Sequence, residues 1–269
     1  MIYLIVIAIV LAGFLYLILP SLRKHENLKE IKNKFIAHRG FHNKEKGIPE
    51  NSMAAFAEAL AYGFAIETDI HITADGEVVA FHDNSLKRMC SADVNIEDLT
   101  LAEIKEFRLD NTDEQIPTLK QLLSLVEGRV PLVIEFKCDK KSCNSLCSAA
   151  NKILSEYEGA FVIKSFFPPA VMWFKKHNKS VCRGILASVY ENKTTFLQYI
   201  SPFLLNFKTR PDFVSYNEKY RNRFMFSLQK LFGVGTMGWT FRNKETLKKG
   251  KKDFDAYIFE EFNPLSKEN

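Results

Sequence analysis

Short apolar runs alternate with longer amphipathic stretches along most of the chain. The apolar runs have the length and β-branched content of buried strands; they span residues 35–38, 64–70, 131–137, 160–166, 182–187, 212–216, 234–240 and 254–259. The amphipathic stretches have helical spacing; they span residues 52–62, 117–128, 142–157, 168–177, 192–207, 218–232 and 242–250. Eight strands in alternation with helices predict an α/β protein with the architecture of a (β/α)8 TIM barrel.

Two segments depart from this alternation. The dipeptide Asp75-Gly76 is favoured in two-residue hairpin turns, so a hairpin is expected to project above the barrel rim, with Asp69 paired opposite His82. Residues 84–116 predict a small insertion after the second strand, with a short helix near residues 101–107.

The segment after the eighth predicted strand lacks a full final helix. Each strand of such a barrel is normally covered by the helix that follows it. The wall is therefore expected to be open at this point, or covered by a helix around residues 28–34. Either arrangement should affect stability more than chemistry.

The N-terminal segment is apolar. Residues 1–22 contain no charged side chain, and residues 2–19 are almost continuously hydrophobic, a run that predicts one transmembrane helix. A cleaved signal peptide is the alternative, but it would need a basic start and a small-residue cleavage site, which this segment lacks. We therefore expect a transmembrane anchor at residues 1–22, a basic linker at 23–34 and the barrel at 35–269.

Basic residues follow the apolar run; they are Arg23, Lys24, Lys29, Lys32 and Lys34. The positive-inside tendency then predicts a single-pass membrane protein whose barrel lies on the cytoplasmic side. The linker enters the first strand at its beginning. The barrel mouth is therefore expected to point away from the membrane, which favours water-soluble substrates.

The composition narrows the classes of function. With 269 residues, 46% of them hydrophobic, the chain suits one large domain with a proper core. A net charge of +5 without any recognisable motif argues against nucleic-acid binding. The five cysteines are odd in number and show neither disulfide-scaffold nor CxxC spacing, which favours reduced thiols over a zinc site. The oligomeric state is not indicated.

Chemically active side chains gather at the ends of three predicted strands; they are His38, Arg39, Glu67, Asp69, His82 and Asp83. Barrel enzymes keep their chemistry at strand ends. Glu67 and Asp69 are two residues apart, so both carboxylates point to one face of a strand. Two such carboxylates repel each other unless a cation lies between them, and oxygen ligands suit Mg²⁺ or Ca²⁺. His42 and His71 are interpreted as loop residues.

An ordered set of motifs resembles the glycerophosphodiester phosphodiesterase family, one of the phosphatidylinositol-phospholipase-C-like phosphodiesterase TIM barrels. The motifs are His38-Arg39-Gly40, Pro49-Glu50-Asn51-Ser52, Glu67-Thr68-Asp69, Thr73-Ala74-Asp75-Gly76, His82-Asp83, Glu135-Phe136-Lys137, Ser165-Phe166 and Gly238-Trp239-Thr240. Together they cover roughly residues 35 to 263 and are specific as a set, although each alone is weak.

The resemblance implies a site and an activity. It implies one divalent cation, Mg²⁺ or Ca²⁺, held by Glu67, Asp69 and Glu135. It implies general acid and base catalysis by two histidines, with His38 assigned as base and His82 as acid by analogy. It implies substrate contacts from Arg39, Lys137 and Trp239. The expected reaction is hydrolysis of small glycerophosphodiesters to glycerol 3-phosphate and an alcohol.

Other functions remain open at this point. A lysophospholipase D would cut lysolipids, and aromatic side chains near the upper rim could hold an acyl chain; they are Phe166, Phe167, Tyr190, Phe196 and Tyr199. An inactive, membrane-tethered phosphate-binding module is an alternative of another class, although no metal ligand or histidine of the family pattern is missing. With inverted topology, the same chemistry would act on extracellular polymers of glycerol phosphate.

Overall fold

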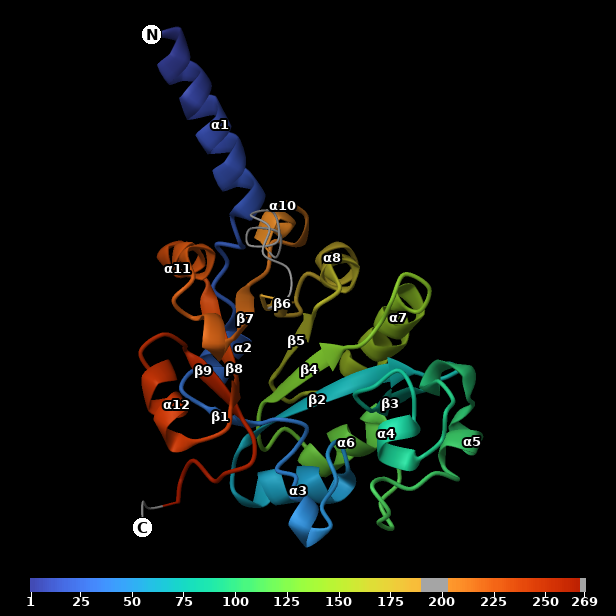
Figure 1. Ribbon diagram of the computed structural model, residues 1–269. Coiled ribbons are helices and arrows are strands. Elements are labelled where there is room, and N and C mark those ends of the chain that lie inside the picture. Colours follow the sequence, from blue (N-terminus) through green and yellow to red (C-terminus); the bar gives the residue numbers. More distant parts are fainter. Residues whose placement is uncertain (190–202, 267–269) are drawn as a thin grey trace.

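The computed structural model describes residues 1–189 and 203–266, and in them it confirms the predicted barrel (Figure 1). The strands form one sheet in the order β1-β9-β8-β7-β6-β5-β4-β2-β3, and β1 also pairs with β2, which closes the barrel. The strands are β1 (Phe35–Ala37), β2 (Ala65–Ile72), β3 (Val78–Ala80), β4 (Leu132–Phe136), β5 (Phe161–Ser165), β6 (Arg183–Ala187), β7 (Phe213–Asn217), β8 (Gly235–Phe241) and β9 (Ala256–Phe259).

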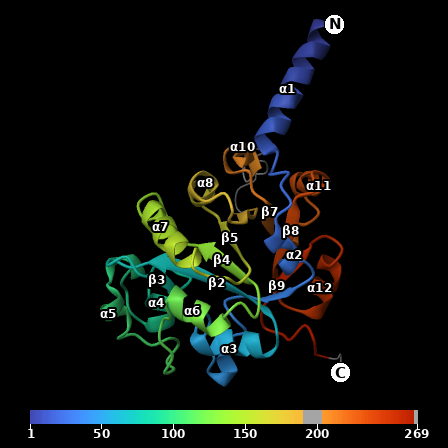
Figure 2. The ribbon, with the colours of Figure 1, turned by 180° about the vertical axis from the view of Figure 1, so that it is seen from behind.

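Helices surround the sheet (Figures 1 and 2). They are α1 (Ile2–Ile18), α2 (Glu26–Ile31), α3 (Met53–Ala61), α4 (Lys87–Cys90), α5 (Leu101–Ile104), α6 (Leu119–Val126), α7 (Cys143–Leu154), α8 (Pro168–His177), α10 (Asn206–Thr209), α11 (Phe224–Leu231) and α12 (Lys244–Gly250), with 3₁₀ turns at Lys44–Lys46, Ile96–Asp98 and Glu218–Tyr220. The helix predicted at 218–232 is thus split in two. Most of the helix predicted at 192–207 lies outside the described residues.

The barrel interior has its own apolar core beneath the site. It consists of Ile31, Ile36, Ala65, Val133, Val162, Cys182, Phe213, Met237, Ala256 and Ile258. Leu28 packs against this core, and Asn27 donates to the carbonyl of Phe161 at the start of β5 (2.7 Å). Helix α2 therefore plugs the end of the barrel where the strands begin.

The wall after the last strand is not open, because β1 pairs with β9 over three residues. Helix α2 covers the base of the barrel instead of this wall. The outer face of β9 is covered by aromatic rings: Phe259 lies 4.9 Å from Phe64, 5.8 Å from Phe41 and 5.7 Å from Phe262, measured between ring centroids. These rings take the place of a final helix.

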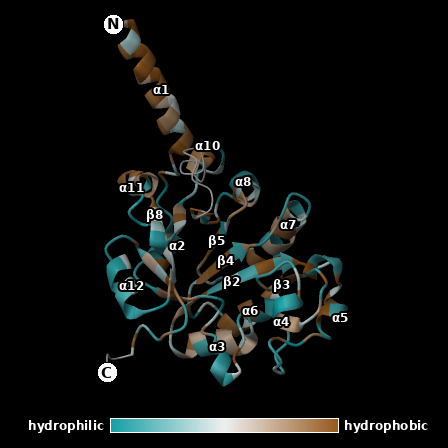
Figure 3. Cartoon of the chain, in the orientation of Figure 1, coloured by the Kyte–Doolittle hydropathy of each residue, from teal (hydrophilic) through white to brown (hydrophobic). Residues whose placement is uncertain are grey.

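Helix α1 projects from the barrel beside α10 (Figures 1 and 2) and is apolar along most of its length (Figure 3). No helix within residues 1–189 and 203–266 combines the length and hydropathy needed to cross a membrane, which corrects the prediction of a transmembrane helix. The helical segment has 17 residues and stops at Ile18, because Leu19 is extended. The cytoplasmic location and the orientation of the mouth, which depended on that span, are untested and stay predictions.

The junction between α1 and the barrel is built from specific contacts. The carbonyl of Ile18 accepts hydrogen bonds from Nδ2 of Asn206 (2.8 Å) and Nε2 of Gln229 (3.0 Å). Further along, Nη2 of Arg23 lies 2.6 Å from Oδ2 of the buried Asp212. The linker is therefore fixed along the barrel.

The hairpin is present, but its register differs from the prediction by one residue. Thr73 donates to the carbonyl of Glu77 (2.9 Å), so the loop between them has three residues instead of two. Its third residue, Gly76, has φ +86°, as three-residue hairpin loops require. Asp69 therefore pairs with Phe81 (3.0 Å, N to O) and not with His82.

The predicted insertion is confirmed as a compact unit beside β3 (Figure 1). It has a small core of its own, made of Val79, Phe81, Leu86, Met89, Ile96, Ile104, Leu109 and Ile116. The helix expected near residues 101–107 is α5, which ends at Ile104 and begins with a capping box between Thr100 and Glu103.

Candidate functional site

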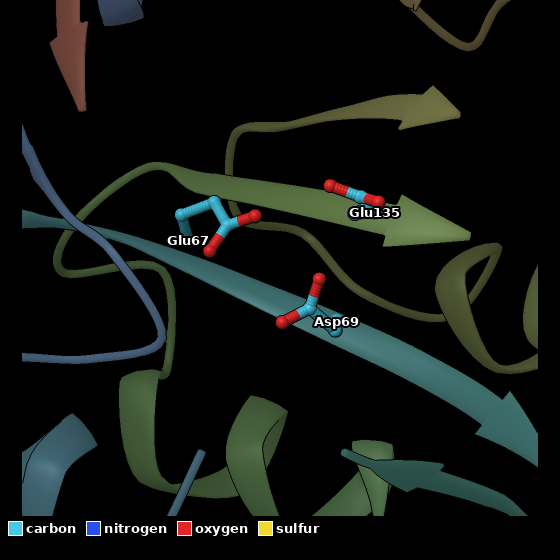
Figure 4. Close-up of side chains that lie close together, drawn as sticks. All are labelled: Glu67, Asp69 and Glu135. Atoms are coloured by element: carbon cyan, nitrogen blue, oxygen red, sulfur yellow. The ribbon is translucent and has the colours of Figure 1, made fainter. Parts of the chain in front are cut away.

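Three carboxylates converge above the apolar interior. Glu67 and Asp69 lie on β2, and Glu135 pairs with Asp69 in the register between β2 and β4 (Figure 4). One carboxylate oxygen from each residue lies within 4.8 Å of the others, and all three side chains are buried. The structure thus brings together the three residues that the resemblance implied as metal ligands.

Three cations face these carboxylates. Nζ of Lys164 lies 2.9 Å from Oε1 of Glu67 and 3.4 Å from Oε2 of Glu135. Nζ of Lys137 lies 3.2 Å from Oδ1 of Asp69 and also contacts Glu135. Nε of Arg39 lies 3.4 Å from Oδ2 of Asp69. Three positive charges therefore offset three negative ones, as buried charges require.

These contacts shift the ionisation of the buried groups. Burial works against ionisation of Asp69, but the charges of Lys137 and Arg39 outweigh it and lower the pKa of Asp69. Burial likewise opposes the charge on Lys164, but Glu67 and Glu135 raise the pKa of its ammonium group. Asp69 and Lys164 are therefore charged near neutral pH.

The residues present fit a hard divalent cation. All three side chains offer oxygen atoms, which Mg²⁺ and Ca²⁺ prefer. Oε1 of Glu67 and Oε1 of Glu135 are buried, and among the described residues each faces one ammonium group, that of Lys164 for Glu67 and that of Lys137 for Glu135. A carboxylate oxygen can accept from more than one partner. These two oxygens have coordination capacity left for a cation.

We expect Lys164→Met to destabilise the metal-free protein by about 3–5 kcal/mol, because it leaves buried carboxylates without their counter-charge. Urea unfolding in EDTA measures the loss. Saturating Mg²⁺ or Ca²⁺ should reduce it, since a dication supplies the missing positive charge. The exposed Lys152, changed to methionine, is the control; equal stability of the two variants in EDTA would contradict the assignment.

His38 follows β1 and faces the carboxylates. Its Nε2 lies 4.0 Å from Oε2 of Glu67, while its Nδ1 donates to Oε2 of Glu260. Arg242 contacts the other oxygen of Glu260. Burial would raise the pKa of Glu260, but hydrogen bonds from His38 and His42 and the charge of Arg242 lower it. Glu260 is thus an anion that fixes the ring of His38.

His82 is held in a similar way after β3. Its Nδ1 donates to Oδ1 of Asp83 (2.5 Å), and Nε of Arg88 donates to Oδ2 of Asp83 (2.6 Å). His71, expected in a loop, lies instead on β2, where it is buried and contacts the carbonyl of His82 (3.3 Å, Nε2 to O). Although the hairpin register differs from the prediction, the charge of His82 still contributes to the lowered pKa of Asp69.

Arg39 is held by Glu50 and not by Asp83. Its Nη1 donates to Oε1 of Glu50 (2.7 Å), and its backbone N–H donates to Oε2 of Glu67 (3.0 Å). Asn51 donates to Oδ2 of Asp69 (3.1 Å), so it supports the site, whereas its neighbour Ser52 caps α3.

Trp239 lies in β8 and packs on the barrel's inner core, with its ring 5.7 Å from that of Phe166. A cavity of about 380 Å³ opens beside the carboxylates; it is lined by Asn84, Asn95, Glu97, Asp98, Glu135, Phe136, Lys137, Cys138, Asp139, Lys141 and Phe166. Of the other rim aromatics considered for an acyl chain, Phe167 packs against the main hydrophobic core, while Tyr190, Phe196 and Tyr199 lie outside the described residues.

Sequence reasoning missed Lys164 and Glu260 as residues of the site. Both follow a common rule: each lies two residues after a side chain of the inner core, as His38 follows Ile36 and Glu67 follows Ala65. Side chains two residues apart on a strand share a face. Continuing this spacing from Val162 and Ile258 would have indicated both residues.

Comparison with known proteins identifies the same family as the motifs in the sequence. The model of the glycerophosphoryl diester phosphodiesterase family matches residues 38–253. A glycerophosphodiester phosphodiesterase of Caldanaerobacter subterraneus is 34% identical over 51% of this chain and 59% of its own. Lysophospholipase D GDPD1 of Homo sapiens is 30% identical over 54% of this chain and 48% of its own. The chain thus spans about half to three fifths of the length of these relatives.

The fold is shared with solved structures. A phosphodiesterase of Oleispira antarctica, solved with the product sn-glycerol-3-phosphate, superposes with a TM-score of 0.72. The superposition covers 87% of this chain and 94% of that one, at 20% sequence identity. At that identity the likeness shows the barrel fold alone.

Proposed function

The chain belongs to the glycerophosphoryl diester phosphodiesterase family, whose model matches residues 38–253, and from that premise we propose that it hydrolyses glycerophosphodiesters to glycerol 3-phosphate and an alcohol. The observation that carries the proposal is the buried group of Glu67, Asp69 and Glu135 with a histidine close to it. Family membership alone would not identify an active site.

Each residue has a role in this proposal. A divalent cation held by the three carboxylates would act as a Lewis acid on a phosphoryl oxygen. Arg39 binds phosphate oxygens through its planar guanidinium, and Lys137 neutralises their charge. Trp239 packs against the glycerol carbons. The pairing of Lys137 with Asp69 shows that its ammonium already lies beside the carboxylates.

The two histidines move the protons. His38 accepts the proton of the neighbouring glycerol hydroxyl that attacks phosphorus, and His82 donates a proton to the leaving alkoxide. Water then opens the cyclic phosphate to give glycerol 3-phosphate. Each ring has Nδ1 engaged by a carboxylate, Glu260 for His38 and Asp83 for His82. Nε2 is therefore the nitrogen that each histidine offers to the reaction.

The decisive experiment measures glycerol 3-phosphate released from glycerophosphocholine by the full chain, with Mg²⁺, Ca²⁺ or EDTA. We expect turnover that depends on the divalent cation. The lysophospholipase D alternative is favoured by the exposed ring of Phe166 (42%) beside the cavity. Choline release from lysophosphatidylcholine, without turnover of glycerophosphocholine, would replace the proposal with that activity. Turnover of neither substrate would favour a phosphate-binding module.

A further inference from the structure

One arginine of the insertion contacts two carboxylates of the site. Arg88 lies in α4, and its Nε donates to Oδ2 of Asp83 (2.6 Å). Its Nη2 donates to Oε1 of Glu50 (2.6 Å) and its Nη1 to Oε2 of the same residue (3.0 Å). A guanidinium that binds one carboxylate with two nitrogens and another with the third has a defined orientation.

Each of these carboxylates holds a different functional side chain. Asp83 accepts the Nδ1 proton of His82 (2.5 Å), and Glu50 accepts a hydrogen bond from Arg39 (2.7 Å). Hydrogen bonds from Arg88 help to lower the pKa of both carboxyl groups against the effect of burial, so both stay ionised. One guanidinium thus lies between the phosphate-binding arginine and the proton-donating histidine.

The insertion keeps Arg88 in place. The neighbouring Met89 and Leu86 are buried in the insertion's own core, and the backbone carbonyl of Met89 accepts a hydrogen bond from Asp110 (2.6 Å). The side chain of Arg88 remains about half exposed (46%). The backbone is therefore fixed, while solvent reaches the guanidinium.

We propose that Arg88 is a positioning residue. Through Glu50 and Asp83, it holds the side chains of Arg39 and His82 in fixed positions relative to each other. The proposal rests on the function proposed above. The insertion then contributes to the reaction, because it supplies the guanidinium that positions the phosphate-binding Arg39 relative to the proton-donating His82.

The other histidine offers a comparison. Arg242, Glu260 and His38 form a chain of the same chemistry, but Glu260 has no contact with Arg39 among the described contacts. Substitution of Arg242 by alanine should therefore lower kcat and leave KM unchanged. Substitution of Arg88 by alanine should lower kcat and also raise KM, because Arg39 loses its support.

The test uses the full chain with glycerophosphocholine. We expect Arg88→Ala to lower kcat about 10- to 100-fold, the usual cost of a misplaced catalytic group, and to raise KM several-fold. Arg88→Lys should recover little, since an ammonium group cannot bridge both carboxylates. Lys87→Ala is the matched control, because Lys87 is an exposed neighbour whose ammonium group, within the part of the chain that the structure describes, pairs only with Asp93 (3.0 Å).

A structural defect is separated from lost positioning by chemical rescue. Added guanidinium ion at low concentration should restore part of the kcat of Arg88→Ala, whereas NaCl at equal ionic strength should not. Unchanged kcat and KM in Arg88→Ala, or a loss that guanidinium does not relieve, would overturn the proposal.

Failure of the proposed function is recognised separately, because the wild-type chain would then hydrolyse no diester. In that case, calorimetry measures the affinity of the protein for glycerol 3-phosphate, which depends on the position of Arg39. Arg88→Ala should weaken this binding several-fold relative to Lys87→Ala. Equal affinities would overturn the role of Arg88.

Discussion

Replacing His38 or His82 with alanine is expected to lower kcat by about 10²- to 10⁴-fold, the usual contribution of a positioned acid or base. Both rings are anchored through Nδ1, so their Nε2 atoms have fixed positions from which to exchange protons. Release of glycerol 3-phosphate from glycerophosphocholine measures the effect. KM should change little, because neither ring is assigned to substrate binding.

His177→Ala is the matched control, since His177 ends α8, where its Nδ1 contacts the carbonyl of Trp173 (3.0 Å) and its ring packs on the indole of the same residue (4.4 Å between centroids). It should retain wild-type kcat. A His38 or His82 variant with wild-type turnover, in folded protein by circular dichroism, would remove that residue from the mechanism. Because the order of acid and base rests on analogy, a substrate with an activated leaving group adds a second readout. It should restore turnover selectively in the variant that lacks the acid.

Removal of divalent cations by EDTA is expected to lower activity by about 10³-fold or more, since a catalytic metal contributes several kcal/mol to stabilising the transition state. Added Mg²⁺ or Ca²⁺ should restore the wild-type protein. The same cations should not restore the activity of Glu67→Gln, because the amide lacks the negative charge of the carboxylate. Lys164, whose Nζ lies 2.9 Å from Oε1 of Glu67 in the native protein, keeps its positive charge. The excess of positive charge then repels the cation.

Glu156→Gln, an exposed change of the same type, should behave as wild type. Calorimetric titration with Mg²⁺ and Ca²⁺ gives a readout that does not depend on turnover. Binding of similar affinity to the wild type and to Glu67→Gln would contradict the assignment of the ligands, and full activity in EDTA would contradict the need for a metal.

The positions of the strands and of most helices followed from hydrophobic periodicity, because buried faces repeat at fixed intervals. Glu67 and Asp69 were also predictable as a pair, since their spacing alone places them on one face, whereas Glu135 was implied only by the resemblance to the family. Arg88 was not predictable, because its bridge between Asp83 and Glu50 exists only once the insertion has folded against the barrel. Glu260 could have been predicted from the alternation of faces along a strand, as the residue two after Ile258. Lys164 could also have been predicted, because it lies two residues after the inner-core residue Val162 and therefore on the same face of its strand.

Two predictions failed for reasons that lie in the backbone. The hairpin loop has three residues because Gly76 takes the left-handed conformation at its end, and one added residue changes every pair in the register. The apolar N-terminal run becomes a helix of 17 residues, since hydrophobicity alone does not determine where a helix stops. Leu19 and Pro20 leave the helix at that point.

The plug formed by α2 also determines the order in which this protein can fold. Ribosomal synthesis makes Leu28 and Ile31 well before Met237 and Ala256 of the surface that they cover. The strands that close the barrel, β1 and β9, are likewise separated by most of the chain. Contacts between such distant segments form late, because the loop that joins them must first lose its entropy. A nascent chain that has not yet released β9 therefore exposes the apolar face of α2, made by Leu28 and Ile31, and an unpaired strand edge, which are aggregation-prone features that chaperones protect.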